Sequence, residues 1–174
     1  VLHEPRRGYG WACLKGIAAL NHPEIVVFLD GDYSDFPEEM VQLVEPIRND
    51  IADLVIGSRT LGKSENDAHP PHARFGNWLA STMIRIFFGQ RYTDLGPFRA
   101  IRYSSLKALQ MEDTTWGWTV EMQIKAVKKK LRILEVPVSY RRRIGKSKIS
   151  GTIVGSIKAG AKIISTILKN KLLD

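Results

Sequence analysis

The sequence predicts an α/β fold in which a mainly parallel sheet is flanked by helices. Segments with helical spacing alternate with short apolar segments along the 174 residues, which is the order that parallel sheets require. The run Ile25–Leu29 is apolar at every position, as expected for a strand covered on both faces. Polar residues follow this strand, at the edge where open α/β sheets bind their ligands.

The first sixty residues hold two expected helices and two expected strands. The helices cover Tyr9–Leu20, ended by Asn21-His22-Pro23, and Pro37 to about Arg48, and the strands cover Ile25–Leu29 and Asp53–Ile56. Glu38 and Glu39 stand in the first turn of the second helix, where the helix dipole favours acidic groups.

The remaining residues hold three expected helices, one strand and three irregular segments. The helices are His72–Phe88, ended by Gly89, Thr119–Lys130 and Thr152–Leu173; the strand is Arg132–Tyr140; the irregular segments are Leu61–Pro71, Asp94–Arg99 and Arg141–Gly151. The last helix carries two stripes at helical spacing. Its apolar stripe is Ile153, Ile157, Ala161, Ile164 and Leu168, and its cationic stripe is Lys158, Lys162 and Lys169.

Composition and charge exclude several classes of protein. The chain is 44% hydrophobic and 25% charged, which is typical of globular proteins and not of disordered or fibrous ones. A single cysteine, Cys13, excludes an internal disulfide, and no apolar run approaches the ~20 residues of a membrane-spanning helix. The net charge of +8 is concentrated in Lys125–Lys171, which holds 14 Lys or Arg and one acid. Such an end indicates an anionic partner, which is nucleic acid, anionic lipid or a phosphorylated substrate.

The most informative motif is Asp30-Gly31-Asp32, directly after the first strand. Two carboxylates so close repel each other unless a cation lies between them. Mg²⁺ and Mn²⁺ prefer carboxylate and phosphate oxygens, so this position suits a metal held by Asp30, Asp32 and a diphosphate. The alternative is a solvated turn whose acids cap the helix that follows.

Four further segments are candidates for ligand binding, each with a structural alternative. Arg59 follows the second strand, and Asp94–Arg99 combines an acid, a Gly-Pro turn and an arginine; the alternatives are a surface arginine and an ordinary turn with an ion pair. The tryptophans of Trp116-Gly117-Trp118 form a platform for a sugar or lipid, or they are core residues. Nearby Glu121 is a functional acid, or it only complements the dipole at the start of its helix. The basic run Arg141–Lys148 binds phosphate groups or is a solvated loop.

Three common types of site are excluded by the sequence. Gly145-Lys146-Ser147 lacks the earlier glycine of a Walker-type phosphate loop, because Tyr140 stands at that position. Cys13 and the four histidines show no metal-ligand spacing. No Gly-x-Ser-x-Gly motif of a serine hydrolase occurs.

Eight segments, taken together and in order, resemble family 2 glycosyltransferases of the GT-A fold, and within that family the polyprenyl-phosphate sugar synthases and their bacterial relatives. The resemblance spans nearly the whole chain. The segments are Arg7-Gly8-Tyr9-Gly10, Asp30-Gly31-Asp32, Gly57-Ser58-Arg59, Arg74-Phe75-Gly76-Asn77, Asp94–Arg99, Glu121-Met122, Glu135-Val136-Pro137-Val138 and Gly145-Lys146-Ser147-Lys148.

For the donor side, the resemblance implies that Asp30 and Asp32 bind Mg²⁺ or Mn²⁺ on the diphosphate of a nucleotide-sugar. It implies that the loop of Gly8 and Gly10 lies near the donor nucleotide. For the acceptor side, it implies that arginines hold the acceptor phosphate and that a mobile basic loop closes over both substrates. The acceptor arginines are Arg59 and Arg74; the loop contributes Arg142, Arg143 and Lys148; Arg99 joins them as a substrate-binding residue.

Two carboxylates are implied as catalytic residues. Asp94 matches an acid near the transfer centre, and Glu121 falls where many family members have the catalytic base. A phosphate acceptor is already ionised and hardly needs a base, whereas a sugar hydroxyl needs Asp94 or Glu121 to take its proton.

The resemblance also predicts the domain organisation. Residues 1–151 form a catalytic domain that is incomplete at its N-terminus, because the strand and loop that bind the nucleobase have no counterpart, and residues 152–174 form a C-terminal amphipathic basic helix. We expect a cytoplasmic domain whose Lys158, Lys162 and Lys169 contact an anionic membrane surface. The alternative is a helix packed on the domain with its lysines in water.

The predicted function is inverting, metal-dependent transfer of a sugar from a nucleotide-diphosphate sugar to a polyprenyl phosphate or to a glycan or lipid hydroxyl. The metal and the basic loop stabilise the charge that grows on the leaving diphosphate. One rival function is a non-catalytic binding module that keeps the fold without turnover. Another is a nucleic-acid-binding protein that uses the basic end, but the ordered acidic and glycine motifs disfavour it, and no nucleic-acid partner is expected.

Overall fold

The computed structural model describes residues 1–65, 70–145 and 153–172. In these residues one sheet contains four strands in the order β1-β3-β2-β4. They are β1 (Ile25–Phe28), β2 (Leu54–Ser58), β3 (Arg99–Arg102) and β4 (Ile133–Pro137). The strands β1, β2 and β4 lie at the three predicted positions, and β3 was not predicted.

The sheet is mixed rather than mainly parallel in its pairings. β3 runs antiparallel to both of its neighbours, β1 and β2, while β2 and β4 are parallel. It follows that β1, β2 and β4 share one direction and that the inserted β3 runs against them. β3 has two apolar residues between two arginines, so no strand pattern is visible in its sequence. Its backbone is satisfied by pairing on both sides.

The central strand β2 is buried at every residue. Its side chains alternate between two cores, because successive residues of a strand point to opposite faces. Leu54 and Ile56 belong to the larger core, and Val55 belongs to the smaller one. β1 was expected to be covered on both faces, but it lies at an edge of the described sheet and is mostly half-buried.

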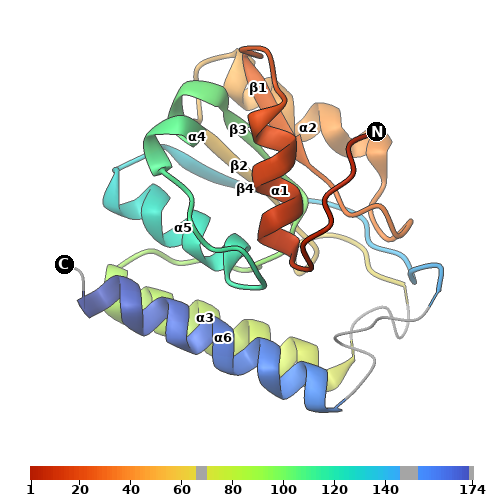
Figure 1. The fold of residues 1–174 in the computed structure, drawn as a ribbon, viewed down its shortest axis with the longest axis vertical. Helices are drawn as coiled ribbons and strands as arrows, with labels where there is room; N and C mark the ends of the chain where they lie inside the picture. Colours follow the sequence, from red (N-terminus) through yellow and green to blue (C-terminus); the bar gives the residue numbers. More distant parts are fainter. Residues whose placement is uncertain (66–69, 146–152, 173–174) are drawn as a thin grey trace.

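Helices cover both faces of this sheet (Figure 1). They are α1 (Tyr9–Ala18), the 3₁₀ turn η1 (Pro37–Glu39), α2 (Met40–Arg48), α3 (Pro71–Phe88), α4 (Tyr103–Leu109), α5 (Trp118–Lys128) and α6 (Ile153–Leu172). All five predicted helices are present, and α4 was not predicted. α3 ends as expected at Gly89, whose left-handed backbone (φ 75°) is a common helix stop.

The two faces of the sheet differ in how many layers of helices cover them. α2 packs through Leu43 and Ile47 into the smaller core. The other face is covered by α1, α4 and α5, and α3 and α6 lie side by side as a further layer against α5 (Figure 1). A cavity lies where α3 passes over the ends of the central strands.

The outer helix α6 does not bury its apolar stripe. In a globular protein such a stripe ordinarily faces the core. Here Ile157 is 66% exposed and Leu168 is 43% exposed, while Thr166, Ile167 and Asn170 are the buried residues. The predicted stripe therefore points largely outward; the side chain of its first member, Ile153, lies outside the described side chains. Within the described residues, neither α6 nor any other helix has the length and apolarity needed to cross a membrane.

Candidate active site

An acidic turn follows β1. Asp32 accepts hydrogen bonds from the backbone N–H and the hydroxyl of Ser34 through its Oδ1 atom, the former at 3.0 Å. The backbone N–H of Asp30 donates to Oδ2 of Asp35 at 3.3 Å. Asp35 is 2% exposed, and its other oxygen, Oδ1, is buried without a hydrogen-bond partner. Three carboxylates thus stand within six residues at the carboxyl end of a strand.

Nearby arginines compensate these carboxylates only in part: Arg143 pairs with Asp32, and Arg59 lowers the pKa of Asp30 and of Asp35. Burial raises the pKa of Asp30, and the nearby Asp32 raises it further. Burial also raises the pKa of Asp35 to about 6. Ionised carboxylates in such a place are stabilised by a cation, and the unpartnered oxygen of Asp35 shows that protein donors do not saturate the turn. The residues therefore fit a divalent metal.

The rest of the coordination of such a metal must come from a ligand. Among residues 1–65, 70–145 and 153–172, no group of three or more His, Cys, Asp or Glu side chains is arranged to hold a metal ion. Mg²⁺ is commonly bound in this way, by one or two carboxylates together with substrate phosphates. Asp30 and Asp32, the predicted pair, therefore stay the candidates for such a site.

The start of the predicted basic loop lies against the acidic turn. Nη2 of Arg143 stands 3.1 Å from Oδ2 of Asp32, and the N–H of Ile144 donates to the carbonyl of Asp32 at 2.9 Å. Arg142 is exposed, and its N–H donates to Glu65 at 2.9 Å. Lys148, which was predicted to join these arginines, lies outside the described residues.

Arg141 is a structural anchor that the sequence did not distinguish from its neighbours. Its guanidinium lies 3.3 Å from the ring centre of Tyr33 and 4.2 Å from that of Phe36. Its N–H donates to the carbonyl of Ser34 at 3.0 Å. Stacking of an arginine on aromatic rings fixes the base of the loop on the acidic turn.

Arg59 and Asp94 form a two-point ion pair. Nε and Nη2 of Arg59 stand 2.6 and 2.7 Å from the two carboxylate oxygens, and the backbone N–H of Arg59 donates to Oδ2 at 2.9 Å. The Asp94 side chain is 2% exposed and that of Arg59 is 17% exposed. Burial alone lowers the pKa of Arg59, but Asp94 outweighs it and the net direction is upward. The charge of Arg59 therefore persists across the physiological pH range.

The backbone around Asp94 is held by side chains from three elements. Glu135 of β4 accepts from the N–H groups of Thr93 and Asp94 at 2.9 and 3.1 Å. Asn77 of α3 accepts from the next N–H along the chain at 2.9 Å. Gln123 of α5 donates to the carbonyl of Asp94 at 3.0 Å. Asp94 is thus immobilised relative to the sheet, and through it Arg59 is too.

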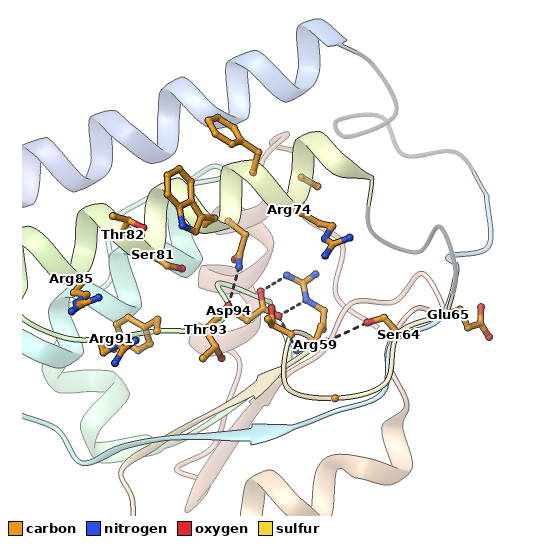
Figure 2. A pocket seen from close by; sticks show the side chains of 17 residues that line it. Arg59, Ser64, Glu65, Arg74, Ser81, Thr82, Arg85, Arg91, Thr93 and Asp94 are labelled. Carbon is orange, nitrogen blue, oxygen red and sulfur yellow. Dashed lines mark hydrogen bonds and ion pairs between the residues drawn. The ribbon is translucent and has the colours of Figure 1, made fainter.

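A cavity of about 950 Å³ opens between α3 and the strand ends (Figure 2). Its charged lining consists of four arginines and two carboxylates, so it suits an anion. These residues are Arg59, Arg74, Arg85, Arg91, Glu65 and Asp94. The structure brings the predicted Arg59, Arg74 and Asp94 together in this cavity. Arg85 and Arg91 were missed, because an exposed arginine in the last turn of a helix or just after it carries no signal of its own in a sequence.

The acidic turn and the cavity are neighbouring parts of one region. Arg59 lines the cavity and also lowers the pKa of Asp30 and of Asp35, which places its charge near the turn. The region therefore combines a turn whose carboxylates suit a cation with a cavity whose arginines suit an anion.

Glu121 lies elsewhere. It is 4% exposed, accepts from the N–H groups of Glu112 and Asp113 at 3.1 and 2.8 Å, and pairs with Lys125 at 2.8 Å. It lines a separate cavity of about 290 Å³ against α6. The two predicted catalytic carboxylates, Asp94 and Glu121, are thus not brought together.

Gly8 and Gly10 pack against the segment that Glu121 holds. A Cβ atom on Gly8 would lie 2.2 Å from the carbonyl oxygen of Thr114, and one on Gly10 would lie 2.0 Å from that of Asp113. The N–H of Trp11 also donates to Thr114, at 3.1 Å. Close backbone contact explains both glycines without a nucleotide, and their role in donor binding stays a prediction.

Arg99 is not among the residues that line the cavity. It is fully buried, and its guanidinium donates to the backbone carbonyls of Leu95, Gly96 and Thr119, the last at 3.0 Å. Burial lowers its pKa. The guanidinium therefore supports the loop that carries Asp94 and has no exposed surface, so its role in substrate binding stays a prediction.

Helices on both faces of a mixed sheet, with an acidic turn and a basic cavity at its edge, are the architecture of a GT-A glycosyltransferase. The chain belongs to this class of protein through glycosyl transferase family 2, whose sequence profile matches residues 1–110.

Curated relatives agree with this assignment. The chain is 33% identical over 153 residues to an undecaprenyl-phosphate mannosyltransferase of Micrococcus luteus, covering 85% of this chain and 60% of that protein. It is 28% identical to a dolichyl-phosphate hexose transferase of Haloferax volcanii, covering 99% of this chain and 73% of that protein. The chain thus spans less than two thirds of the mannosyltransferase.

Solved structures support the fold. Glucosyl-3-phosphoglycerate synthase of Mycobacterium tuberculosis, in complex with Mn²⁺, uridine-diphosphate and phosphoglyceric acid, superposes with a TM-score of 0.72 at 18% identity. The match covers 97% of this chain and 56% of that one.

Proposed function

We propose that this protein transfers a sugar, with inversion, from a nucleotide-diphosphate sugar to the phosphate of a polyprenyl phosphate. One observation carries the choice of acceptor. Both oxygens of Asp94 are bound by Arg59, and Glu121 is bound by Lys125 and two backbone amides. Neither carboxylate is placed to remove a proton from a hydroxyl, and a phosphate acceptor needs no base because it is already ionised.

The cavity supports the same acceptor. Arg59 and Arg74 line it beside Asp94, and guanidinium groups bind phosphate oxygens through charged hydrogen bonds. The relatives named as undecaprenyl-phosphate and dolichyl-phosphate sugar transferases use acceptors of this class. In the reaction a phosphate oxygen attacks the anomeric carbon, and the bond from that carbon to the nucleoside diphosphate breaks.

Asp30 and Asp32 would hold Mg²⁺ or Mn²⁺ together with the donor diphosphate. Bound there, the metal neutralises the negative charge that develops on the leaving group. Arg143, which stands 3.1 Å from Asp32, is close enough to contact the same phosphates. We place Arg142 and Lys148 in the same role on the resemblance alone. The Mn²⁺ in the synthase structures supports this proposal.

We also propose peripheral contact with an anionic membrane through the outer faces of α3 and α6. The exposed apolar side chains there are Phe75, Trp78, Ile86, Ile157 and Leu168. Lys158 and Lys169 are exposed beside them, but Lys162 pairs with Asp113 at 2.8 Å and is not free to bind lipid as predicted. An apolar face flanked by lysines is typical of a helix that lies in the membrane interface. Failure to bind anionic liposomes at low salt would contradict this contact.

The test of the transfer reaction compares acceptors and removes the metal site. UDP- and GDP-sugars are incubated with Mn²⁺ and either a polyprenyl phosphate, a lipid alcohol or phosphoglycerate, and the product is measured. We expect product with the polyprenyl phosphate and a loss of at least about 100-fold in Asp32→Asn, since the metal supplies several kcal/mol of transition-state stabilisation. Asp50→Asn, which removes an exposed carboxylate, is the matched control.

Three outcomes separate the candidate functions. Product that forms equally fast in Asp32→Asn would contradict the metal site. Product formed with the lipid alcohol and not with the polyprenyl phosphate would identify a hydroxyl as the acceptor group. Donor binding, seen as a metal-dependent rise in melting temperature, without any transfer would favour the non-catalytic binding module.

A further inference from the structure

The cavity beside α3 has two basic ends, and the proposed reaction uses one of them. Arg74 and Arg85 both stand on α3, eleven residues apart, so their backbones are about 16 Å apart along the helix axis. Figure 2 shows Arg85 and Arg91 at the end of the cavity away from Arg59 and Arg74. One phosphate group cannot contact both ends in this arrangement.

A buried hydroxyl faces this cavity without a partner. Ser81 of α3 lines the cavity, is 9% exposed, and its Oγ atom makes no hydrogen bond. A helical serine ordinarily bonds to the carbonyl four residues earlier or to water. A buried polar atom left unpaired destabilises the fold, so such an atom in the wall of a cavity indicates a ligand group that completes it.

The charges at this end are uncompensated. In the described ranges of the chain, neither Arg85 nor Arg91 has a carboxylate within ion-pair distance, whereas Arg59 is held by Asp94. The carboxylates in the cavity wall are Asp94, which is that partner, and Glu65, which accepts the N–H of Arg142. Two free guanidinium groups and an unpaired hydroxyl are a donor set for phosphate oxygens.

We infer that Arg85, Arg91 and Ser81 form a second phosphate-ester site, separate from the place of the reacting acceptor. The inference rests on the proposed function only for the occupant of the other end, which is the acceptor phosphate. Phe75 and Trp78 flank the cavity, each 60% exposed, with ring centres 5.7 Å apart. An exposed aromatic pair in the wall of the same cavity, on α3 between Arg74 and Ser81, suits an amphiphilic ligand, such as a phospholipid whose headgroup phosphate enters the cavity. Free phosphate shares the same chemistry.

The first experiment uses inorganic phosphate as the probe and backbone amide NMR as the readout. We expect saturable shifts at Ser81 and Arg91, and a loss of affinity of roughly tenfold or more in Arg85→Gln/Arg91→Gln. Ser81→Ala weakens binding without affecting folding, because it removes an unpaired hydroxyl. Arg48→Gln/Lys107→Gln removes two positive charges from exposed positions elsewhere and is the matched control. Absence of shifts at Ser81 and Arg91, or equal losses in the control, would overturn the inference.

The second experiment separates the two sources of phosphate. Binding is measured to phosphatidylcholine vesicles with and without phosphatidylglycerol. If Arg85→Gln/Arg91→Gln weakens binding to the anionic vesicles more than the control does, the site takes a lipid headgroup. If phosphate shifts the site but vesicle binding follows the control, the site takes a free phosphate ester. Donor-induced thermal shifts are recorded in parallel, so a failed transferase proposal is distinguished from a failed phosphate site.

Discussion

Asp94 and Glu121 are both buried acids with a cationic partner, yet their surroundings differ. Asn77, Gln123 and Glu135 bind the backbone around Asp94. The carboxylate of Asp94 is therefore available to pair with Arg59 in the wall of the large cavity. The carboxylate of Glu121 instead accepts hydrogen bonds from the backbone N–H groups of residues 112 and 113.

The difference teaches how to separate functional from structural acids in a fold of this kind. We expect Asp94, whose backbone is immobilised from several directions and whose side chain pairs with Arg59 in the cavity wall, to position that arginine for ligand binding. An acid whose side chain caps backbone amides stabilises a loop. Substitution of Asp94 should therefore lower activity, whereas substitution of Glu121 should lower stability and leave activity unchanged.

The largest effect is expected for Asp94→Asn. An amide offers one acceptor in place of two and no charge, so Arg59 loses its fixed position. We expect kcat/KM for the acceptor to fall by about 100-fold, and the free energy of unfolding to fall by about 2–4 kcal/mol. Steady-state kinetics and denaturant unfolding measure both, and donor affinity is the internal control. An unchanged kcat/KM would show that Asp94 contributes to stability and not to acceptor binding.

The next largest effect is expected for Gly10→Ala. Its new Cβ atom would lie 2.0 Å from the carbonyl oxygen of Asp113, and backbone must move to admit it. We expect a loss of about 2–4 kcal/mol in the free energy of unfolding. Gly16→Ala is the matched control on the same helix, because no atom lies within 4 Å of its added Cβ atom. That change should stabilise the protein by roughly 0.5–1 kcal/mol. Equal effects of the two substitutions would refute the packing role.

The acidic turn should make stability depend on pH through Asp35. Its pKa is raised to about 6, above the value near 4 of an unfolded chain, so the folded state binds more protons between these values. Stability without added metal should therefore fall as pH rises from about 4 to 6, by about 2–3 kcal/mol in total. Asp35→Asn should remove the contribution of Asp35 from this slope in a series of melting curves; the slope that remains comes from Asp30 and Glu135, whose pKa values burial also raises. Asp53→Asn should retain the slope between about pH 4 and 6, because the pKa of Asp53 is lowered to about 2 and this group titrates below that range.

The smallest effect is expected for Glu121→Gln. The amide keeps one acceptor for the backbone N–H groups and loses the ion pair with Lys125. We expect a loss of about 1–2 kcal/mol in the free energy of unfolding, with the transfer rate per folded molecule unchanged. A large drop in rate at unchanged stability, together with a shifted pH profile, would identify Glu121 as the catalytic base after all.

Local patterns in the sequence predicted most elements and the acidic turn. Helical spacing located α1, α2, α3, α5 and α6, and the apolar run located β1. Asp30 and Asp32 were recognisable because two acids directly after a strand are a local feature. Arg85, Arg91 and Ser81 were not recognisable, since a cavity forms only when α3 is laid over the strand ends.

By itself, the sequence determined where helices and strands form and which segments carry charge, because both depend on neighbouring residues. Tertiary structure decided that β3 runs against the other strands, that the apolar stripe of α6 points outward, and that Asp94 rather than Glu121 faces the cavity. These outcomes depend on contacts between distant residues, such as the pair of Arg59 and Asp94, thirty-five positions apart. Such contacts form because buried charges and backbone groups must find partners, and the fold sets which partners are within reach.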